Sequence, residues 1–317
     1  MGLLLGGTLQ KAGVEVLFLG REVLLAPLRS GLSVHRRRRS EQVGPLKAVF
    51  TLAEAVRMGP FQYTLVTFKS FHNAQAIPQA GQIPSGYLVV AQNGLGNEEV
   101  FQQAGLPVIS AALTCSVRLG KPEVLQVGRG GLGLAPGDLS VDLAVRFRKG
   151  GLDTWLYPSW PAMKASKWLL NLLGNPLAAA LEMSPERYLA EEAGFRLEKI
   201  LLREGLSLLR CLGLPLVNLP GFPVRALPLL LHMPREAWRG ILGQGRGGKL
   251  PSFLLDQRAG KPLEHEALLG TPLHLGKERG LALPLLSLLE RLLSSSSPTD
   301  DSFHFNPQRL LEAYLIS

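Results

Sequence analysis

The sequence predicts an α/β fold, a doubly wound parallel sheet, followed by an all-helical C-terminal domain. A chain of 317 residues is longer than one typical domain, so we expect two compact units. Short apolar runs alternate with helical patterns in the first half, which is typical of a parallel sheet covered by helices. After Pro158 these runs give way to long Leu-rich helical segments. We therefore expect domains at residues 1–157 and 158–317.

The first half opens on a helix at Leu3–Gly13, which a glycine ends, followed by a buried strand at Val14–Leu19. A helix is expected at Asn73–Gln79 between two of the later strands. Further strands that continue the sheet are expected at Tyr63–Phe68, Tyr87–Ala91, Pro107–Val117 and Glu123–Val127. Apolar runs separated by helices in this way predict a doubly wound arrangement.

The second half reads as helices separated by turns. Proline-rich and glycine-rich stretches, Gly213–Pro234 and Gly240–Gly248, are interpreted as turns, and Ser294–Pro298 as a flexible loop. Helices are expected at Ala162–Met183, Pro185–Leu212, Leu250–Gln257, Glu264–Arg279 and Gln308–Leu315.

Composition excludes several classes of protein. No run approaches the roughly 18 apolar residues that cross a bilayer, so we expect no membrane partner. The opening residues lack the basic segment of an export signal. Cys115 and Cys211 lie far apart without metal-ligand spacing, which predicts neither a disulfide framework nor a metal site. A reducing, cytoplasmic compartment fits these features.

The net charge of +9 raises the question of nucleic-acid binding. Its densest source is the run Arg36–Arg39, which has neither interleaved aromatic residues nor a zinc-finger pattern beside it. We interpret the run as a solvated loop and expect no nucleic-acid partner; a role in binding an anionic ligand and true nucleic-acid binding stay open as alternatives.

The N-terminus looks like part of a dinucleotide-binding unit. Such a unit normally opens with a strand, the turn G-x-G-x-x-G and a helix whose first amides hold the pyrophosphate. Here Met1–Gly7 looks like the tail of that turn and its helix, with Gly2 as the third glycine, although an ordinary helix cap is the alternative for Gly2. The first strand and two glycines are not in the sequence. We expect that the start codon was placed too late and that Met1 lies inside the glycine turn.

The residue that ends the second strand of such a unit selects the cofactor. An acid there binds the ribose 2'-hydroxyl, whereas an arginine accommodates a 2'-phosphate. Arg21 follows the expected strand and predicts NADPH, while Glu22 one residue later keeps NADH open. Lys69 follows another strand, at the sheet edge where ligands bind, and is a further candidate for cofactor binding.

Polar side chains recur at spacings that suggest a substrate site. Asn93 follows the strand Tyr87–Ala91, although an Asn-Gly pair is also an ordinary turn. Lys167, Asn171 and Asn175 are spaced i, i+4 and i+8, which predicts one polar stripe on a Leu-rich helix. Burial of such a stripe is costly without partners, and a ligand would supply them; a solvated surface stripe is the alternative.

A third polar set comprises Ser252, Asp256 and Glu264, with Lys249 just before it. Ser252 and Asp256 share a helical face. A serine with an acid also suggests a hydrolase, but the chain has no G-x-S-x-G turn, and we exclude that chemistry.

Taken in order, these pieces resemble the ketopantoate reductase family over nearly the whole chain. The resemblance implies a Rossmann-like NADP-binding domain, a helical substrate domain, and NADPH-dependent reduction of 2-dehydropantoate to (R)-pantoate on the route to pantothenate and coenzyme A. The segments that carry it are Met1–Gly2, Gly20–Arg21, Val66–Lys69, Gln92–Glu99, Lys167–Pro176, Pro251–Asp256 and Glu264.

The resemblance also implies a role for each candidate. Lys167 would be the catalytic lysine, which stabilises and protonates the oxygen of the reduced ketone. Asn93 would orient the substrate beside the nicotinamide. The remaining roles would be substrate binding by Asn171, Asn175, Ser252 and Glu264, and cofactor binding by Gly2, Arg21, Lys69 and Asn93. No metal is expected.

Two departures from the family pattern bear on the substrate. Glu264 is not followed by the Asn-Gly pair of many members, and Lys249-Leu250 stands where some members carry a substrate-binding asparagine. A related branched 2-oxo acid therefore stays open as the substrate, as does a non-catalytic binding module built on a truncated reductase fold. A homodimer is possible for a reductase and for a binding module.

Overall fold

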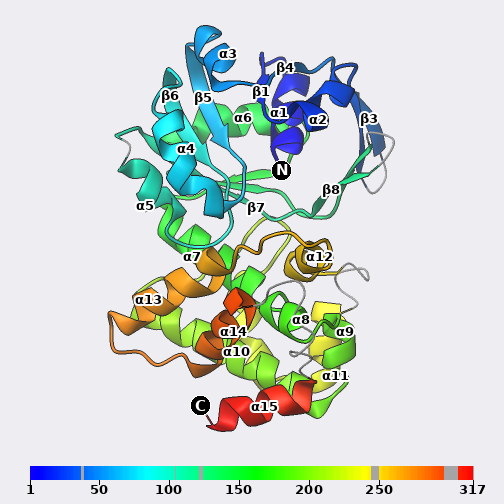
Figure 1. The fold of residues 1–317 in the computed structure, drawn as a ribbon, viewed down its shortest axis with the longest axis vertical. Coiled ribbons are helices and arrows are strands. Elements are labelled where there is room, and N and C mark those ends of the chain that lie inside the picture. The colour runs from blue at the N-terminus through cyan, green and yellow to red at the C-terminus, as the bar shows by residue number, and fades with distance from the viewer. Residues whose placement is uncertain (37–38, 104, 121–123, 244–249, 296–305, 317) are drawn as a thin grey trace. The chain divides into compact units, whose positions relative to one another are not determined.

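A computed structural model describes residues 1–36, 39–103, 105–120, 124–243, 250–295 and 306–316 of the protein. Its contacts divide the chain into two compact units. Unit 1 comprises Met1–Gln92, Gly96–Met163 and Asn218–Phe222, and unit 2 comprises Asn93–Leu95, Lys164–Val217 and Pro223–Ser317. Unit 1 is α/β and unit 2 is helical, which confirms the fold class expected from the sequence (Figure 1).

The largest sheet of unit 1 has the strand order β11-β10-β7-β6-β5. β5, β6 and β7 run parallel, β10 runs antiparallel to β7, and β11 runs parallel to β10. Its strands are β5 (Phe61–Val66), β6 (Ser85–Val90), β7 (Val108–Leu113), β10 (Leu132–Ala135) and β11 (Thr154–Leu156). Every residue of β7 is buried, as a central strand covered on both faces requires.

Two smaller sheets complete unit 1. One is the parallel pair of β1 and β4, and the other has the order β3-β2-β9-β8. Their strands are β1 (Leu17–Leu19), β2 (Leu32–Arg36), β3 (Arg39–Val43), β4 (Lys47–Val49), β8 (Val117–Gly120) and β9 (Val124–Val127). The expectation that Glu123–Val127 continues the main sheet is wrong, because β9 pairs with β2 and β8. An apolar run identifies a strand but not its partner.

Two helix ends in unit 1 are fixed by local caps. Thr51 and Glu54 form a reciprocal capping box at the start of α3, and Gly13, with φ +87°, follows α1. The helices are α1 (Gly2–Lys11), α2 (Glu22–Leu25), η1 (Ala26–Leu28), α3 (Leu52–Arg57), η2 (Ser70–His72), α4 (Asn73–Ala80), α5 (Asn97–Gln102), η3 (Asp138–Ser140) and α6 (Val141–Lys149).

The basic run lies across a hairpin and not in a simple loop. Arg36 ends β2 and pairs in register with Arg39, which begins β3. The interpretation of the run as a loop is therefore wrong for Arg36 and Arg39. Residues 37 and 38, in the middle of the run, lie outside the described part of the chain.

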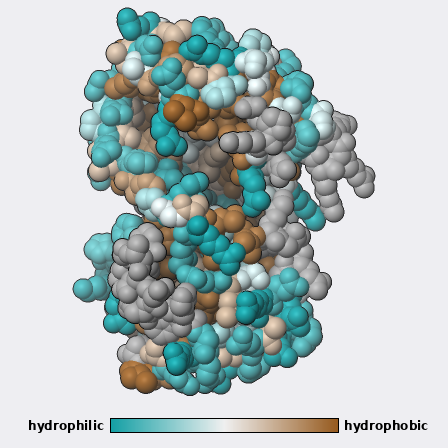
Figure 2. Space-filling view, turned by 45° about the vertical axis from the view of Figure 1, so that its right-hand side comes forward, coloured by the Kyte–Doolittle hydropathy of each residue, from teal (hydrophilic) through white to brown (hydrophobic). Residues whose placement is uncertain are grey.

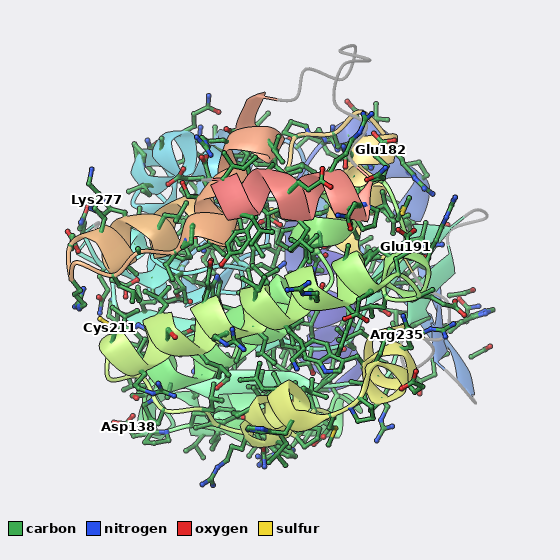
Figure 3. The ribbon with its side chains drawn as sticks, turned by 90° about the horizontal axis from the view of Figure 1, so that it is seen from below. Asp138, Glu182, Glu191, Cys211, Arg235 and Lys277 are labelled. Atoms are coloured by element: carbon green, nitrogen blue, oxygen red, sulfur yellow. The ribbon has the colours of Figure 1, made fainter. Side chains whose placement is uncertain are left out.

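Unit 2 is a set of helices around leucine and aromatic side chains, with Trp168, Tyr188 and Trp238 fully buried. α10 packs against α14 and α15, and Figure 3 shows α10 running from near Glu191 to Cys211. Several predicted helices are split, and η4 lies where only turns were expected. The elements are α7 (Trp160–Leu172, which begins in unit 1), α8 (Pro176–Ala180), α9 (Pro185–Tyr188), α10 (Glu192–Cys211), η4 (Val224–His232), α11 (Arg235–Trp238), η5 (Arg239–Gly243), α12 (Ser252–Arg258), η7 (Glu266–Gly270), α13 (Thr271–Lys277), α14 (Pro284–Ser295) and α15 (Pro307–Ile316).

Among the described residues, no helix combines the length and the apolar character that a bilayer crossing needs.

Candidate active site

The predicted substrate-site residues come together in unit 2. A small pocket is lined by five of them together with Gly94, Phe253 and Leu268; the five are Asn93, Asn171, Asn175, Ser252 and Glu264. Lys167 is joined to this group through a hydrogen bond to Asn171. Four separate segments of the sequence therefore supply one polar site.

A row of hydrogen bonds runs along the α7 side of the pocket. The Lys167 ammonium donates to Asn171 Oδ1 at 2.9 Å, and Asn171 Nδ2 donates to Asn93 Oδ1 at 3.2 Å. Lys167 and Asn171 lie one turn apart on α7, as their i, i+4 spacing predicts. The row fixes the ammonium group and both amides in one orientation.

Asn175 does not lie on that helix. α7 ends at Leu172, Gly174 adopts φ +79°, and Asn175 is the N-cap of α8, so the predicted continuous stripe is wrong at its last member. The turn nevertheless folds Asn175 back: its Nδ2 donates to the Asn171 carbonyl at 2.7 Å, and its Oδ1 accepts from Ser252 Oγ at 3.2 Å. Pro176 at the first position of α8 makes the break local, since proline starts helices well.

The loop that carries Asn93 is anchored by backbone contacts. Leu95 N–H donates to the Ala267 carbonyl at 3.1 Å, and Gly94 has φ +91°. A Cβ on Gly94 would lie 2.5 Å from both Cβ and O of Ala267, so only glycine fits there. Trp168 of α7 donates to the adjacent Leu268 carbonyl at 2.8 Å. The segment around η7 thus holds both the Asn93 loop and α7.

Ser252 and Glu264 close the other side of the pocket. Ser252 is exposed and starts α12, whereas Glu264 is 6% exposed and precedes η7. Asp256, which shares α12 with Ser252, is absent from the pocket lining. Lys249 lies outside the described residues.

The cavity volume is about 10 Å³, room for roughly one water molecule. A six-carbon acid needs more space. Because the asparagine and serine side chains bond to one another, a ligand would have to replace those bonds with its own oxygens.

Glu198 is a structural member of the site that the sequence reading missed. Its fully buried carboxylate on α10 accepts from Gly174 N–H at 2.7 Å and from the Tyr188 hydroxyl at 2.7 Å. The first bond holds the turn between Asn171 and Asn175. A charged residue among the leucines of the helix was the available signal, because buried carboxylates need partners.

Three of the four cofactor candidates, Gly2, Arg21 and Lys69, lie in unit 1, whereas Asn93 belongs to unit 2. α1 starts beside the carboxyl end of β5: a Cβ on Gly2 would come within 2.7 Å of Thr67 Oγ1. This close approach is the role expected of the third glycine in a dinucleotide turn. Lys69 is half-buried after β5. Burial lowers the pKa of the Met1 amino group, and the nearby Lys69 charge lowers it further.

Arg21 is separated from the end of β1 by Gly20 and is exposed, in extended backbone at the start of α2. Glu22 next to it is also exposed. Both residues are therefore accessible at the carboxyl end of a parallel strand, where an α/β sheet binds ligands.

A second amide network fixes the loops after β5 and β6. Gln92 Nε2 donates to Asn73 Oδ1 at 2.7 Å and to the Phe68 carbonyl at 3.1 Å, and Asn73 Nδ2 donates to Asn97 Oδ1 at 2.9 Å. This network holds the end of β5, which Lys69 follows, against the start of α5.

One cluster in the described part of the chain brings metal-ligand atoms together. The ligand atoms of His265, Glu266 and Glu290 lie within 4.8 Å of one another, and His265 Nδ1 is 3.6 Å from Glu290. The cluster is partly exposed, and exposed acidic groups of this kind are common without a metal ion.

The chain matches the family model "Ketopantoate reductase PanE/ApbA" over residues 1–137 and its C-terminal model over residues 160–296. It is 27% identical to a 2-dehydropantoate 2-reductase of Pyrococcus horikoshii over 58% of this chain and 62% of that relative's length. The chain thus spans less than two thirds of that relative.

Two solved structures share the fold. A 2-dehydropantoate 2-reductase from Geobacter metallireducens GS-15 is 24% identical with a TM-score of 0.80, over 93% of this chain and 96% of that one. D-mandelate dehydrogenase with NADH and anilino(oxo)acetate is 14% identical with a TM-score of 0.74, over 99% of this chain and 96% of that one. The two family models together span most of the sequence and confirm the resemblance, so the chain belongs to the ketopantoate reductase family.

Proposed function

We propose that the protein is an NADPH-dependent reductase that converts 2-dehydropantoate to (R)-pantoate. The observation that carries the proposal is the hydrogen-bonded row from Lys167 through Asn171 to Asn93 along a polar pocket. Family membership supports an oxidoreductase of this type. The reduction would serve pantothenate and coenzyme A synthesis.

The chemistry requires a proton donor beside a carbonyl oxygen. When bound, the nicotinamide supplies a hydride to the ketone carbon. The oxygen then gains negative charge, which the Lys167 ammonium stabilises and to which it gives a proton. Asn171 accepts a hydrogen bond from Lys167 and thereby holds its Nζ in place. Solvent returns the proton to Lys167 after the product leaves.

The amides and the serine would recognise the rest of the substrate. Asn93 orients the reacting end, Asn171 and Asn175 bond the hydroxyl end, and Ser252 bonds the carboxylate. Glu264 would contact either Lys167 or the substrate. Each of these side chains except Lys167 lines the pocket, which supports this division of roles.

The cofactor would be held by unit 1. The fit of Gly2 against Thr67 lets the N-terminus of α1 approach the sheet edge, where its amides attract a pyrophosphate. Arg21 would bind the 2'-phosphate, and Lys69 would contact phosphate or ribose. Because Glu22 is also exposed, NADH is the competing cofactor.

A related 2-oxo acid is the competing substrate, since an aryl 2-hydroxy acid dehydrogenase shares the fold. We keep the cytoplasm as the compartment, which agrees with two free cysteines. We propose a homodimer as its assembly, which sedimentation tests.

The direct experiment follows NADPH oxidation by the purified chain with 2-dehydropantoate, phenylglyoxylate and unbranched 2-oxo acids, each repeated with NADH. The proposal predicts the highest kcat/KM for NADPH with 2-dehydropantoate. A higher kcat/KM for another acid would move the assignment to that substrate. Inactivity with every pair would favour a non-catalytic binding module.

A further inference from the structure

Two apolar side chains line a pocket that is otherwise polar. Phe253 and Leu268 surround the pocket together with Gly94 and the five polar side chains described above, and all of these residues belong to unit 2. Figure 2 shows hydrophilic residues over much of one face of unit 2, whereas Phe253 and Leu268 are each only 4% exposed. The pocket therefore offers a ligand one small apolar wall among hydrogen-bonding groups.

Each apolar side chain is adjacent to a polar group of the site. Phe253 follows Ser252 in the first turn of α12. Leu268 lies one helical turn after Glu264, whose carbonyl accepts the Leu268 N–H at 3.1 Å. The two segments thus each present one hydrogen-bonding and one apolar side chain to the pocket. A ligand that contacts Ser252 or Glu264 also meets this apolar wall.

Backbone hydrogen bonds hold both apolar residues in place. The Leu268 carbonyl accepts from Trp168 Nε1 at 2.8 Å, on the helix that carries Lys167. The Phe253 N–H donates to Asn175 Oδ1 at 3.5 Å, which is a longer and weaker bond. Buried side chains in a close-packed interior have little room to turn aside. The amides and the serine can exchange their hydrogen bonds with a ligand, whereas the apolar wall keeps its place.

The proposed substrate has a part that hydrogen bonds cannot recognise. 2-Dehydropantoate carries a carboxylate and a ketone at one end, a hydroxyl at the other, and two methyl groups on the carbon between them. The amide and serine side chains of the pocket account for the polar ends. The methyl groups gain free energy from contact with apolar surface, because burial removes them from water. Phe253 and Leu268 supply that surface.

The size of the pocket favours a short branched chain over a ring. The pocket has a volume of about 10 Å³, and the Phe253 ring already forms part of its wall. An aryl 2-oxo acid such as phenylglyoxylate would bring a second ring to this place, which overpacks the wall unless Phe253 moves. Two methyl groups need less space and can lie against the ring.

We propose that Phe253 and Leu268 determine which 2-oxo acid is reduced: they receive the branched carbon next to the ketone and exclude aryl groups from that position. The preferred substrate class is a short 2-oxo acid that is branched at C3 and carries a hydroxyl group at its far end. This inference rests on the proposed function and adds to it the residues that choose among 2-oxo acids.

Steady-state kinetics with three acids test the wall: 2-dehydropantoate, its unbranched analogue 4-hydroxy-2-oxobutanoate, and phenylglyoxylate. Loss of the methyl groups should lower kcat/KM of the native protein at least about tenfold, since one methylene in an apolar pocket changes it roughly 10-fold to 200-fold. In Phe253→Ala this preference for the branched acid should fall to about twofold or less, and kcat/KM for phenylglyoxylate should rise at least about tenfold. Phe253→Leu keeps an apolar side chain and should retain most of the preference.

Leu254→Ala is the matched control. Leu254 is a fully buried neighbour of Phe253 on α12 and is not among the described residues that line the pocket. Its truncation leaves a cavity in the same helix, so it should lower stability without changing the ratio of kcat/KM between the acids. Leu268→Ala should lower the ratio as Phe253→Ala does. An equal loss for all three acids in Phe253→Ala would assign Phe253 to the core alone and overturn the proposal.

A binding measurement separates this proposal from the proposed reaction. Calorimetry gives the Kd of the native protein and of Phe253→Ala for (R)-pantoate and for 2,4-dihydroxybutanoate, which lacks the two methyl groups, each with and without NADP⁺. The native protein should bind pantoate at least about tenfold more tightly, and the variant should bind both acids about equally. That result would support the wall even if no acid were reduced, in which case the proposed reaction alone would fail. Equal affinities in the native protein, or no binding of pantoate, would contradict the wall.

Discussion

In unit 2 the polar groups of the pocket hydrogen-bond one another, whereas in unit 1 the strands that precede the cofactor candidates, β1 and β5, each pair with a single strand among the described residues. Asn171, for example, hydrogen-bonds with Lys167, Asn93 and Asn175. β1, by contrast, pairs on one side only. The difference teaches that the proposed substrate site is preorganised by its own residues, while the cofactor candidates Arg21 and Lys69 follow strands of two different sheets, β1 and β5. Removing groups from the pocket should therefore have large, local effects.

The largest effect is expected from Lys167→Ala. Loss of the proton donor should lower kcat roughly 10²-fold to 10⁴-fold with little change in NADPH binding. Stopped-flow measurement of NADPH oxidation checks this. Lys277→Ala, an exposed lysine on α13 of the same unit, is the matched control and should be silent. Near-normal turnover of Lys167→Ala would remove it from catalysis.

Glu198→Ala tests whether a buried carboxylate preorganises the pocket. The variant leaves Gly174 N–H and the Tyr188 hydroxyl without this acceptor in a dry core, which should cost about 2 to 4 kcal/mol of unfolding free energy. Urea denaturation measures the loss. Glu198→Gln keeps an acceptor for Gly174 and should recover part of it. An equally large loss of unfolding free energy in Glu198→Gln would show that the negative charge of Glu198, more than its role as a hydrogen-bond acceptor, stabilises the turn.

Asn175→Ala tests the fold-back of the turn. The variant removes an acceptor from Ser252 and a donor to Asn171, so KM for the 2-oxo acid should rise about tenfold while kcat changes less. Steady-state kinetics give the split. If kcat fell and KM stayed constant, Asn175 would act on the reacting end of the substrate.

Arg21→Ala should have the smallest effect of the four variants, and it tests a cofactor candidate in unit 1. Loss of one charge-assisted contact to a 2'-phosphate should raise the Kd for NADPH about tenfold and leave the Kd for NADH nearly constant. Fluorescence titration checks both. Arg57→Ala, another exposed arginine of unit 1, serves as the control. Equal weakening of both cofactors would exclude Arg21 from 2'-phosphate recognition.

The sequence predicted the helical unit, the strands β5, β6 and β7, and the residues that gather in the pocket. These features depend on local patterns: apolar runs for strands and the i, i+4 spacing for Lys167 and Asn171. The predictions from the sequence failed where tertiary contacts decide the partner of a strand or the end of a helix. β9 left the predicted sheet because β2 supplied its partner, and Asn175 left the helix because Gly174 and Pro176 break it. Glu198 carries no motif, and only its burial beside Gly174 identifies its role.

The central claim is that the protein reduces a 2-oxo acid by direct hydride transfer from the nicotinamide, with Lys167 as the proton donor. The most direct measurement uses NADPH carrying deuterium at the transferable position of the nicotinamide and mass spectrometry of the product. The account predicts pantoate with one deuterium at C2, formed in equal amount to the NADPH consumed, and almost no product with Lys167→Ala. Unlabelled pantoate, or NADPH loss without any hydroxy acid, would contradict it.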